Sequence, residues 1–233
     1  MNEETVLSFL LGLHVLAGSV SLVVAPLAML VAKGGNWHRI WGKTFFYGMG
    51  LVALTAILLG FIRPNVLMAL VALFSFHMIA SGYRALYLKK LHEGQKPRRI
   101  DHVIQGSAGV VNLGIFLWGL SHLFLGNSDG TALIFLVFGS IGLLMVLMNM
   151  RRFFKRNHDK QEWLYGHMTG FLGGYIATVS AFSAVNMGFI EPKWLQWLWP
   201  TIIGSPLIFY WVRYYRGRFT RGRRPKDIMK VRI

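Results

Sequence analysis

Long apolar runs separated by short polar connectors dominate the hydrophobicity pattern of the chain. A helix needs roughly 20 apolar residues to cross ~30 Å of hydrocarbon. Seven runs qualify, covering about residues 5–32, 43–62, 65–88, 102–125, 131–150, 163–189 and 195–215. Because a bilayer core offers backbone groups no water, such runs are expected to be helical. The pattern predicts an all-α integral membrane protein, a bundle of about seven transmembrane helices.

Proline and glycine mark where these helices break or bend. Arg63-Pro64 separates the second run from the third, since proline is tolerated at a helix start and disrupts a helix interior. The glycine-bounded segment 126–130 predicts a turn between the fourth and fifth runs. Three prolines fall inside runs and are expected to kink the first and seventh helices: Pro26, Pro200 and Pro206.

The distribution of basic residues predicts an orientation. Of 25 Lys and Arg, 23 fall in the first, third and fifth connectors and the C-terminal segment, which all lie on one side of the membrane if the runs alternate in direction. Only Arg63 and Lys193 fall in the connectors on the opposite side. Because basic connectors stay in the cytoplasm, the N-terminus is predicted outside and the C-terminus inside. We therefore expect one transmembrane domain over residues 1–215 and a basic cytoplasmic tail over 216–233.

Composition narrows the classes of function. The net charge of +16 would suit a nucleic-acid-binding protein, but it is concentrated in connectors and no folded reading module accompanies it, so no nucleic-acid partner is expected. The expected partners are the lipid bilayer and, for Arg213–Arg232, anionic headgroups at the cytoplasmic face. The alternative is that this segment only anchors the last helix. The absence of cysteine excludes disulfides and thiolate chemistry.

Histidine is the ionisable residue that the apolar runs contain, and ionisable side chains in a bilayer are functional candidates. His14 and His77 lie on runs that cross in the same direction, within ~5 Å of each other in predicted depth. His102 and His167 both lie near the inner boundary. The sequence therefore predicts two levels of paired histidines on different helices.

Paired histidines at two depths are what a membrane protein with two b-type haems requires, because neutral imidazoles are good axial ligands for haem iron. Glycines on the same helical face would leave room for a porphyrin. They follow three of the histidines by three, four or seven residues: Gly18, Gly106, Gly109, Gly170 and Gly174. The alternative explanation for these glycines is close helix packing through small residues.

Each histidine also has a structural explanation. His14 and His77 could hydrogen-bond to nearby polar groups such as Ser19, Ser75, Asn112 or Tyr175. His102 could be a helix-start or headgroup residue, with Asp101 as the N-cap of its helix. His38 fits an interfacial belt of aromatic and basic residues. His122 points away from His102 and lies near the outer interface, so it is not counted as a ligand.

Three classes of function follow. The first is a haem-binding electron-transfer protein in which His14 with His77, and His102 with His167, hold haem b; any enzyme would then be a membrane oxidoreductase. The second is a transporter, or a sensor or assembly protein, with a polar cavity and no haem. The third is a structural protein that binds no small ligand. Four amides could line such a cavity or hydrogen-bond between helices: Gln105, Asn112, Asn149 and Asn186. No hydrolase, kinase or dinucleotide motif is present, and no catalytic residue is predicted.

Several short segments resemble a known group of proteins. These are His14, Gly18 and Pro26 in the first run, then segments 38–42, 163–168 and 174–182. Together they resemble uncharacterised bacterial multi-helix membrane proteins of the domain-of-unknown-function 2306 type. This resemblance implies a multi-pass protein of the bacterial inner membrane and supplies no activity. Paired histidines on separate helices are also similar in architecture to cytochrome b561-type proteins, although their order and spacing do not clearly match.

Overall fold

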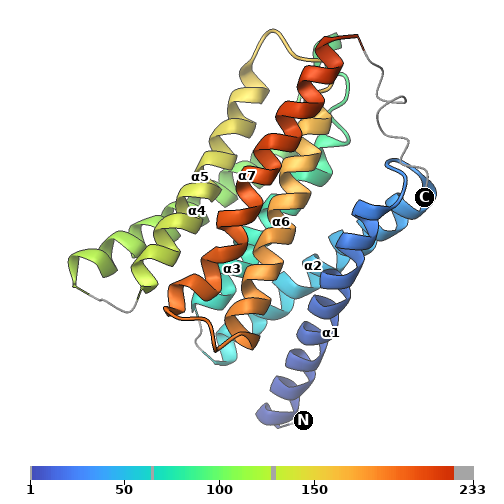
Figure 1. The fold of residues 1–233 in the computed structure, drawn as a ribbon. Coiled ribbons are helices and arrows are strands. Elements are labelled where there is room, and N and C mark those ends of the chain that lie inside the picture. The colour runs from blue at the N-terminus through green and yellow to red at the C-terminus, as the bar shows by residue number, and fades with distance from the viewer. Residues whose placement is uncertain (1, 64–65, 127–129, 223–233) are drawn as a thin grey trace. The chain divides into compact units, whose positions relative to one another are not determined.

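The computed structural model describes residues 2–63, 66–126 and 130–222. Within these ranges it contains seven α-helices (Figure 1): α1 (Glu3–Leu30), α2 (Asn36–Ile62), α3 (Val66–Ala85), α4 (Arg99–Phe124), α5 (Thr131–Phe154), α6 (Glu162–Asn186) and α7 (Lys193–Thr220). A short 3-10 turn, η1 (Leu91–Glu93), precedes α4. Each predicted run corresponds to one helix, so the all-helical prediction is confirmed for this part of the chain.

Six of these helices, α1 to α6, are long and apolar enough to cross a membrane. The chain is therefore a multi-pass membrane protein by helix length and hydropathy. Helix α7 is 28 residues long but less apolar, with Pro200 and Pro206 inside it and arginines in its C-terminal half. It continues to Thr220, so the first residues of the predicted tail are helical; residues 223–233 lie outside the described part.

The chain divides into two units, which are described separately. Unit 1 comprises Met1–Ala72 and Tyr210–Ile233, and it holds α1, α2, the start of α3 and the end of α7. Unit 2, Leu73–Phe209, holds the rest of α3 and α7 together with α4, α5 and α6. His14 belongs to unit 1, and the other three predicted ligands belong to unit 2.

In unit 1, α1 and α2 pack side by side through small residues (Figure 1). A Cβ at Gly48 would lie 2.5 Å from the Ser21 hydroxyl, and one at Gly18 would lie 3.9 Å from Val52. Close approach through glycine and serine is typical of helix contacts in a bilayer. Large apolar side chains such as Val15 and Leu16 are exposed on α1. In a membrane these would face lipid.

The connection between α1 and α2 is held by side chains that bind the last carbonyls of α1. Lys33 donates to the carbonyls of Ala28 and Val31, and His38 Nδ1 lies 2.9 Å from the Ala28 carbonyl oxygen. A cation at a helix C-terminus also interacts favourably with the negative end of the helix dipole. Burial lowers the pKa of the Lys33 ammonium. The Trp37 and Trp41 rings stack on each other with their centroids 5.8 Å apart. The position of His38 in an interfacial belt stays a prediction.

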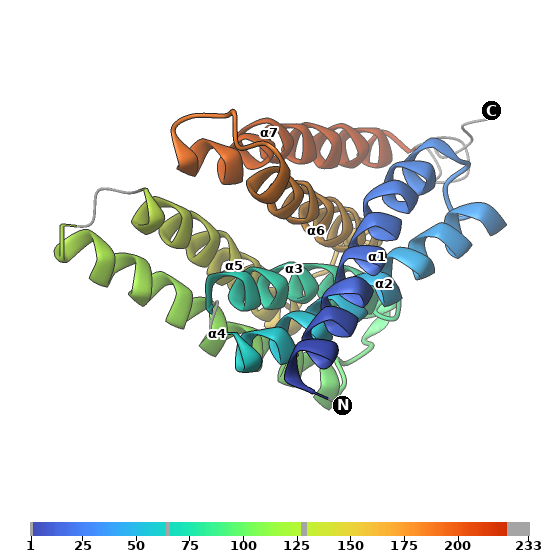
Figure 2. The ribbon, with the colours of Figure 1, turned by 90° about the horizontal axis from the view of Figure 1, so that it is seen from below.

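In unit 2, α3 contacts three neighbouring helices. It bonds to α4 through polar side chains, stacks Phe74 on Phe138 of α5 with ring centroids 5.3 Å apart, and meets α6 where a Cβ at Gly170 would lie 2.6 Å from the backbone of Gly82. Figures 1 and 2 both show α4 beside α5 and α6 beside α7. The α4–α5 contact is equally close, because a Cβ at Gly139 would lie 2.7 Å from an α4 backbone nitrogen.

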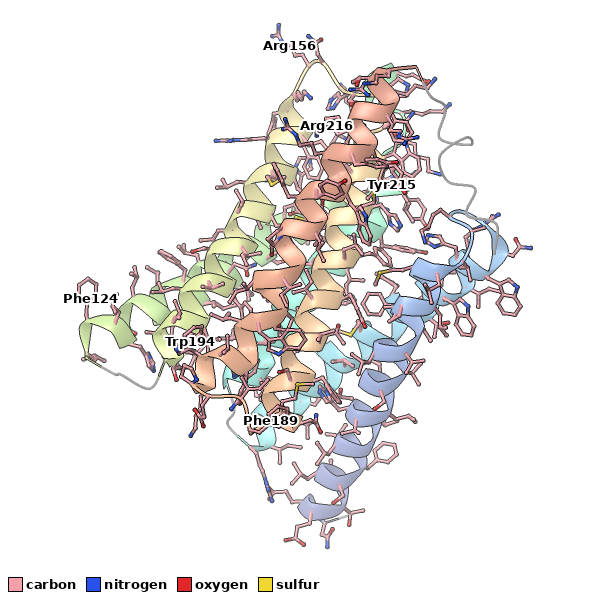
Figure 3. The ribbon with its side chains drawn as sticks, in the orientation of Figure 1. Phe124, Arg156, Phe189, Trp194, Tyr215 and Arg216 are labelled. Atoms are coloured by element: carbon pink, nitrogen blue, oxygen red, sulfur yellow. The ribbon has the colours of Figure 1, made fainter. Side chains whose placement is uncertain are left out.

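The two ends of unit 2 differ in chemistry. At one end are the connectors that follow α3 and α5, and Figure 3 shows Arg156 beyond this end. Phe189 and Trp194 lie at the opposite end (Figure 3). The basic connectors also pack locally, since the Lys89 ammonium lies 4.7 Å from the centroid of the Trp163 ring. We call the end that holds the connectors following α3 and α5 the basic end.

Candidate functional site

A cluster of polar side chains is buried between α3, α4 and α5, toward the basic end of unit 2. Its members come from the last turns of α3 and α5 and the first turns of α4. We define the polar cluster as His77, Ser81, Gln105 and Asn149, and each of these four is 6% exposed or less. Polar groups buried inside apolar helices must be hydrogen-bonded to one another to be tolerated.

Gln105 is the centre of the polar cluster. Its Oε1 accepts from Asn149 Nδ2 at 3.3 Å and lies 3.2 Å from His77 Nε2, while its Nε2 donates to the Ser81 hydroxyl at 2.9 Å. Since Oε1 only accepts, His77 Nε2 must carry the hydrogen. The neutral ring then has its lone pair on Nδ1, which is buried without a hydrogen-bond partner among the described residues.

A salt bridge lies beside the polar cluster. Arg84 donates from Nε to Asp101 Oδ1 at 2.7 Å and from its second guanidinium nitrogen to Oδ2 at 3.2 Å. The Asp101 carboxylate is 1% exposed and also accepts the Arg98 backbone N–H at 2.7 Å. The prediction that Asp101 is the N-cap of its helix is wrong. Helix α4 begins at Arg99, so its N-cap is Arg98 and Asp101 is its third residue. From that position the Asp101 carboxylate accepts the backbone N–H of the N-cap.

Three members of the polar cluster, all but His77, line one small cavity together with the salt bridge. Its polar lining consists of Ser81, Arg84, Asp101, Gln105, Asn149 and Arg152, and apolar side chains complete it. About 10 Å³ is open to the centre of a water-sized sphere. That is the room that one water molecule or a ligand of similar size needs.

Arg152 is the one charged group of this cavity that lacks a close counter-ion within the described ranges. It makes no hydrogen bond or salt bridge there, and its guanidinium lies against Gly166, where a Cβ would be 2.3 Å from it. The nearby carboxylate is Glu162, which acts on Arg152 only at longer range. Glu162 is already bonded to His158 at 2.7 Å and to Lys155 at 3.5 Å.

The predicted ligands His14 and His77 have partners other than those proposed from the sequence. His14 Nδ1 lies 2.9 Å from the Thr55 hydroxyl within unit 1. The Thr55 hydroxyl donates to the Leu51 carbonyl at 2.7 Å, so it accepts from His14. His77 bonds to Gln105 in unit 2. The two histidines belong to different units, and their pairing stays a prediction.

His102 and His167, the predicted inner pair, contact different helices. His102 is exposed near the start of α4, with its ring centroid 5.3 Å from that of Phe153 on α5. His167 Nδ1 lies 3.3 Å from the Gly82 carbonyl oxygen on α3, and its ring packs on Phe171. Within the described ranges, no group of three or more His, Cys, Asp or Glu side chains is placed to hold a metal ion.

The glycine face predicted on α6 is filled by α3. A Cβ at Gly170 would meet the Gly82 backbone, and one at Gly174 would lie 2.1 Å from Ile79. The interpretation of these two glycines as a flat cofactor face is therefore wrong, and helix packing explains them. Gly106 has nothing within 4 Å, and Gly109 lies at ordinary contact distance from Val146.

The remaining predicted amides differ in environment. Asn112 is fully buried where α4 meets Gly142 of α5, and its Nδ2 donates to the carbonyl of Ala108. Asn186 is exposed and donates to the carbonyl of Phe182 in its own helix. Gln105 and Asn149 are the two amides that line the cavity.

Three cavity residues were missed in the sequence. Arg84 lies inside the predicted third run but was counted by its charge with the cytoplasmic connectors. Arg152 lies just after the predicted fifth run, yet α5 extends to Phe154, so both arginines lie on helices. Ser81 carried no signal of its own. A sign was present in the periodicity, since Ser81 and Arg84, like Asn149 and Arg152, are three residues apart and share a helical face.

Comparison with family models, curated proteins and solved structures finds no match to this chain. The resemblances to bacterial membrane proteins stay predictions, and function must be inferred from the polar cluster.

Proposed function

We propose that this chain is a seven-span protein of the bacterial inner membrane that binds a small polar solute at the polar cluster, as a transporter or sensor does. The N-terminus would lie outside and the C-terminus in the cytoplasm, with the basic end of unit 2 facing the cytoplasm and its anionic lipid headgroups. The 23-to-2 distribution of basic residues supports this orientation. Exposed apolar side chains on the six hydrophobic helices support the bilayer as solvent.

The observation that carries the proposal is the cavity beside the polar cluster. Ser81, Gln105 and Asn149 present hydroxyl and amide groups to a space of one water's size, inside helices whose other residues are largely apolar. Polar groups at such positions are costly unless they serve a ligand or one another. Three hydrogen bonds join the members of the polar cluster to one another. A solute would bind in the space beside them, which Arg84 and Arg152 also line.

Solute binding should appear as thermal stabilisation of the purified protein, because a ligand bound only by the folded state raises its melting temperature. We expect at least one probe among chloride, formate, methylammonium and formamide to raise Tm by about 2 °C or more. Asn149→Leu should abolish this shift. Asn186→Leu removes an exposed asparagine outside the cluster and should keep it. No shift with any of the four probes would contradict the proposal.

A second candidate is haem binding through His14 and His77. The supporting observation is that His14 donates Nδ1–H to Thr55, which leaves Nε2 as the atom that could bind iron, an orientation typical of ligating histidines. Haem binding by His102 and His167 has no comparable support, because α3 occupies the glycine face of α6 that a porphyrin would need. Bound haem would supply electron transfer across the bilayer.

Haem is tested by an absorption spectrum of protein produced with ample haem, first oxidised and then reduced with dithionite. If the second candidate is correct, a Soret band is present and His77→Ala loses it, while Asn186→Leu keeps it. Absence of the band from the unmodified protein would remove haem, and the polar-solute proposal would stand alone.

A further inference from the structure

The charges around the cavity do not balance. Arg84 and Asp101 form a close pair and cancel each other. The remaining cavity cation is Arg152, and the Glu162 carboxylate that acts on it is shared with Lys155 and His158. The cavity therefore has an excess of positive charge. The Arg152 side chain is partly buried. A charge that is partly withdrawn from water without a close partner is unfavourable, and an anion beside it reduces that cost.

The hydrogen-bonding groups have the same bias. A guanidinium has five N–H donors and no acceptor. None of the N–H donors of Arg152 makes a hydrogen bond within the described part of the chain. The side-chain amide of Asn149, one helical turn earlier on α5, adds a second donor group to the lining. Donors and positive charge together select an anion and disfavour a cation.

Size narrows the class further. The room of about 10 Å³ for the centre of a water-sized sphere suits one small ion and is too little for a sugar, a nucleotide or a haem. On these grounds we propose that Arg152 and Asn149 form a binding site for a small monovalent anion of about the size of chloride. This inference rests on the proposed function and names the class of solute.

The test compares the melting temperature of the full chain in sodium chloride and in sodium gluconate at equal sodium concentration, so that ionic strength is matched. At about 150 mM salt we expect Tm to be about 3 °C higher in chloride. Arg152→Gln should lose the difference. Arg151→Gln removes the same charge from the neighbouring, exposed position and should keep it.

A second variant keeps the test decisive if Arg152→Gln does not fold. Asn149→Asp places a carboxylate three residues before Arg152 on the same helical face, where it can replace the anion. Its Tm should be independent of chloride, although the variant loses the hydrogen bond that Asn149 Nδ2 donates to Gln105. A chloride shift that is unchanged in Asn149→Asp or in Arg152→Gln would overturn the inference, as would the absence of any shift in the unmodified protein.

Failure of this inference is distinguishable from failure of the proposed function. If formamide or methylammonium raises Tm and chloride does not, the cavity binds a polar solute that is not an anion, and only the anion site is wrong. If none of these probes raises Tm, the cavity holds water alone and both proposals fail.

Discussion

Replacing Asp101 by asparagine is expected to be among the most destabilising single substitutions in unit 2. The change leaves the Arg84 guanidinium, whose side chain is 19% exposed, without its carboxylate, and it weakens the bond to the Arg98 N–H at the start of α4. Removing one partner of a buried pair costs about 3 kcal/mol or more. The measurement is the free energy of unfolding in detergent.

Two further variants identify the cause of that loss. Glu93→Gln removes a carboxylate that is 55% exposed and pairs with Lys90 and His92, and it should cost under about 1 kcal/mol. Adding Arg84→Met to Asp101→Asn removes the unpaired cation and should recover part of the loss. Equal costs for Asp101→Asn and Glu93→Gln would show that the Arg84–Asp101 pair contributes nothing beyond a surface pair.

Gly170→Ala is expected to disrupt the contact between α3 and α6. The added methyl group would lie 2.6 Å from backbone atoms of Gly82 and Met78, and backbone cannot move aside as a flexible side chain can. Forcing an atom into such a contact costs about 2–3 kcal/mol. Unfolding in detergent measures the loss.

Gly114→Ala provides the matched control on α4. Nothing lies within 4 Å of a Cβ at this exposed position, so alanine should be neutral or should stabilise the helix by about 0.5 kcal/mol. If Gly170→Ala were as harmless as Gly114→Ala, α3 and α6 would not pack through glycine in the membrane.

Helix positions were predictable because one physical requirement, the length of an apolar helix, governs them. The predicted second run ends at residue 62, as α2 does, and the predicted fifth run starts at residue 131, as α5 does. At the basic end, the apolar pattern does not predict which charged residues belong to helices. Arg84 and Arg152 look like connector residues by charge, but both lie on helices, where their partly buried side chains line the cavity.

Partners of the histidines could not be predicted, because depth along a helix says nothing of which neighbour lies beside it. His77 could have bonded to any polar side chain at its level, and the partner is set by the packing of α3 on α4. The same limit applies to glycine. Gly170 follows His167 by three residues and Gly106 follows His102 by four, yet α3 packs against Gly170 and nothing lies within 4 Å of a Cβ at Gly106.

The central claim is that the cavity beside the polar cluster binds a ligand, and that this ligand is a small anion. Diffraction from crystals grown in bromide tests it most directly, because bromide scatters anomalously and replaces chloride. The account predicts an anomalous peak within hydrogen-bond distance of Arg152 and Asn149, absent in Arg152→Gln. A cavity without a peak, with the Glu162 carboxylate bound directly to Arg152, would contradict it.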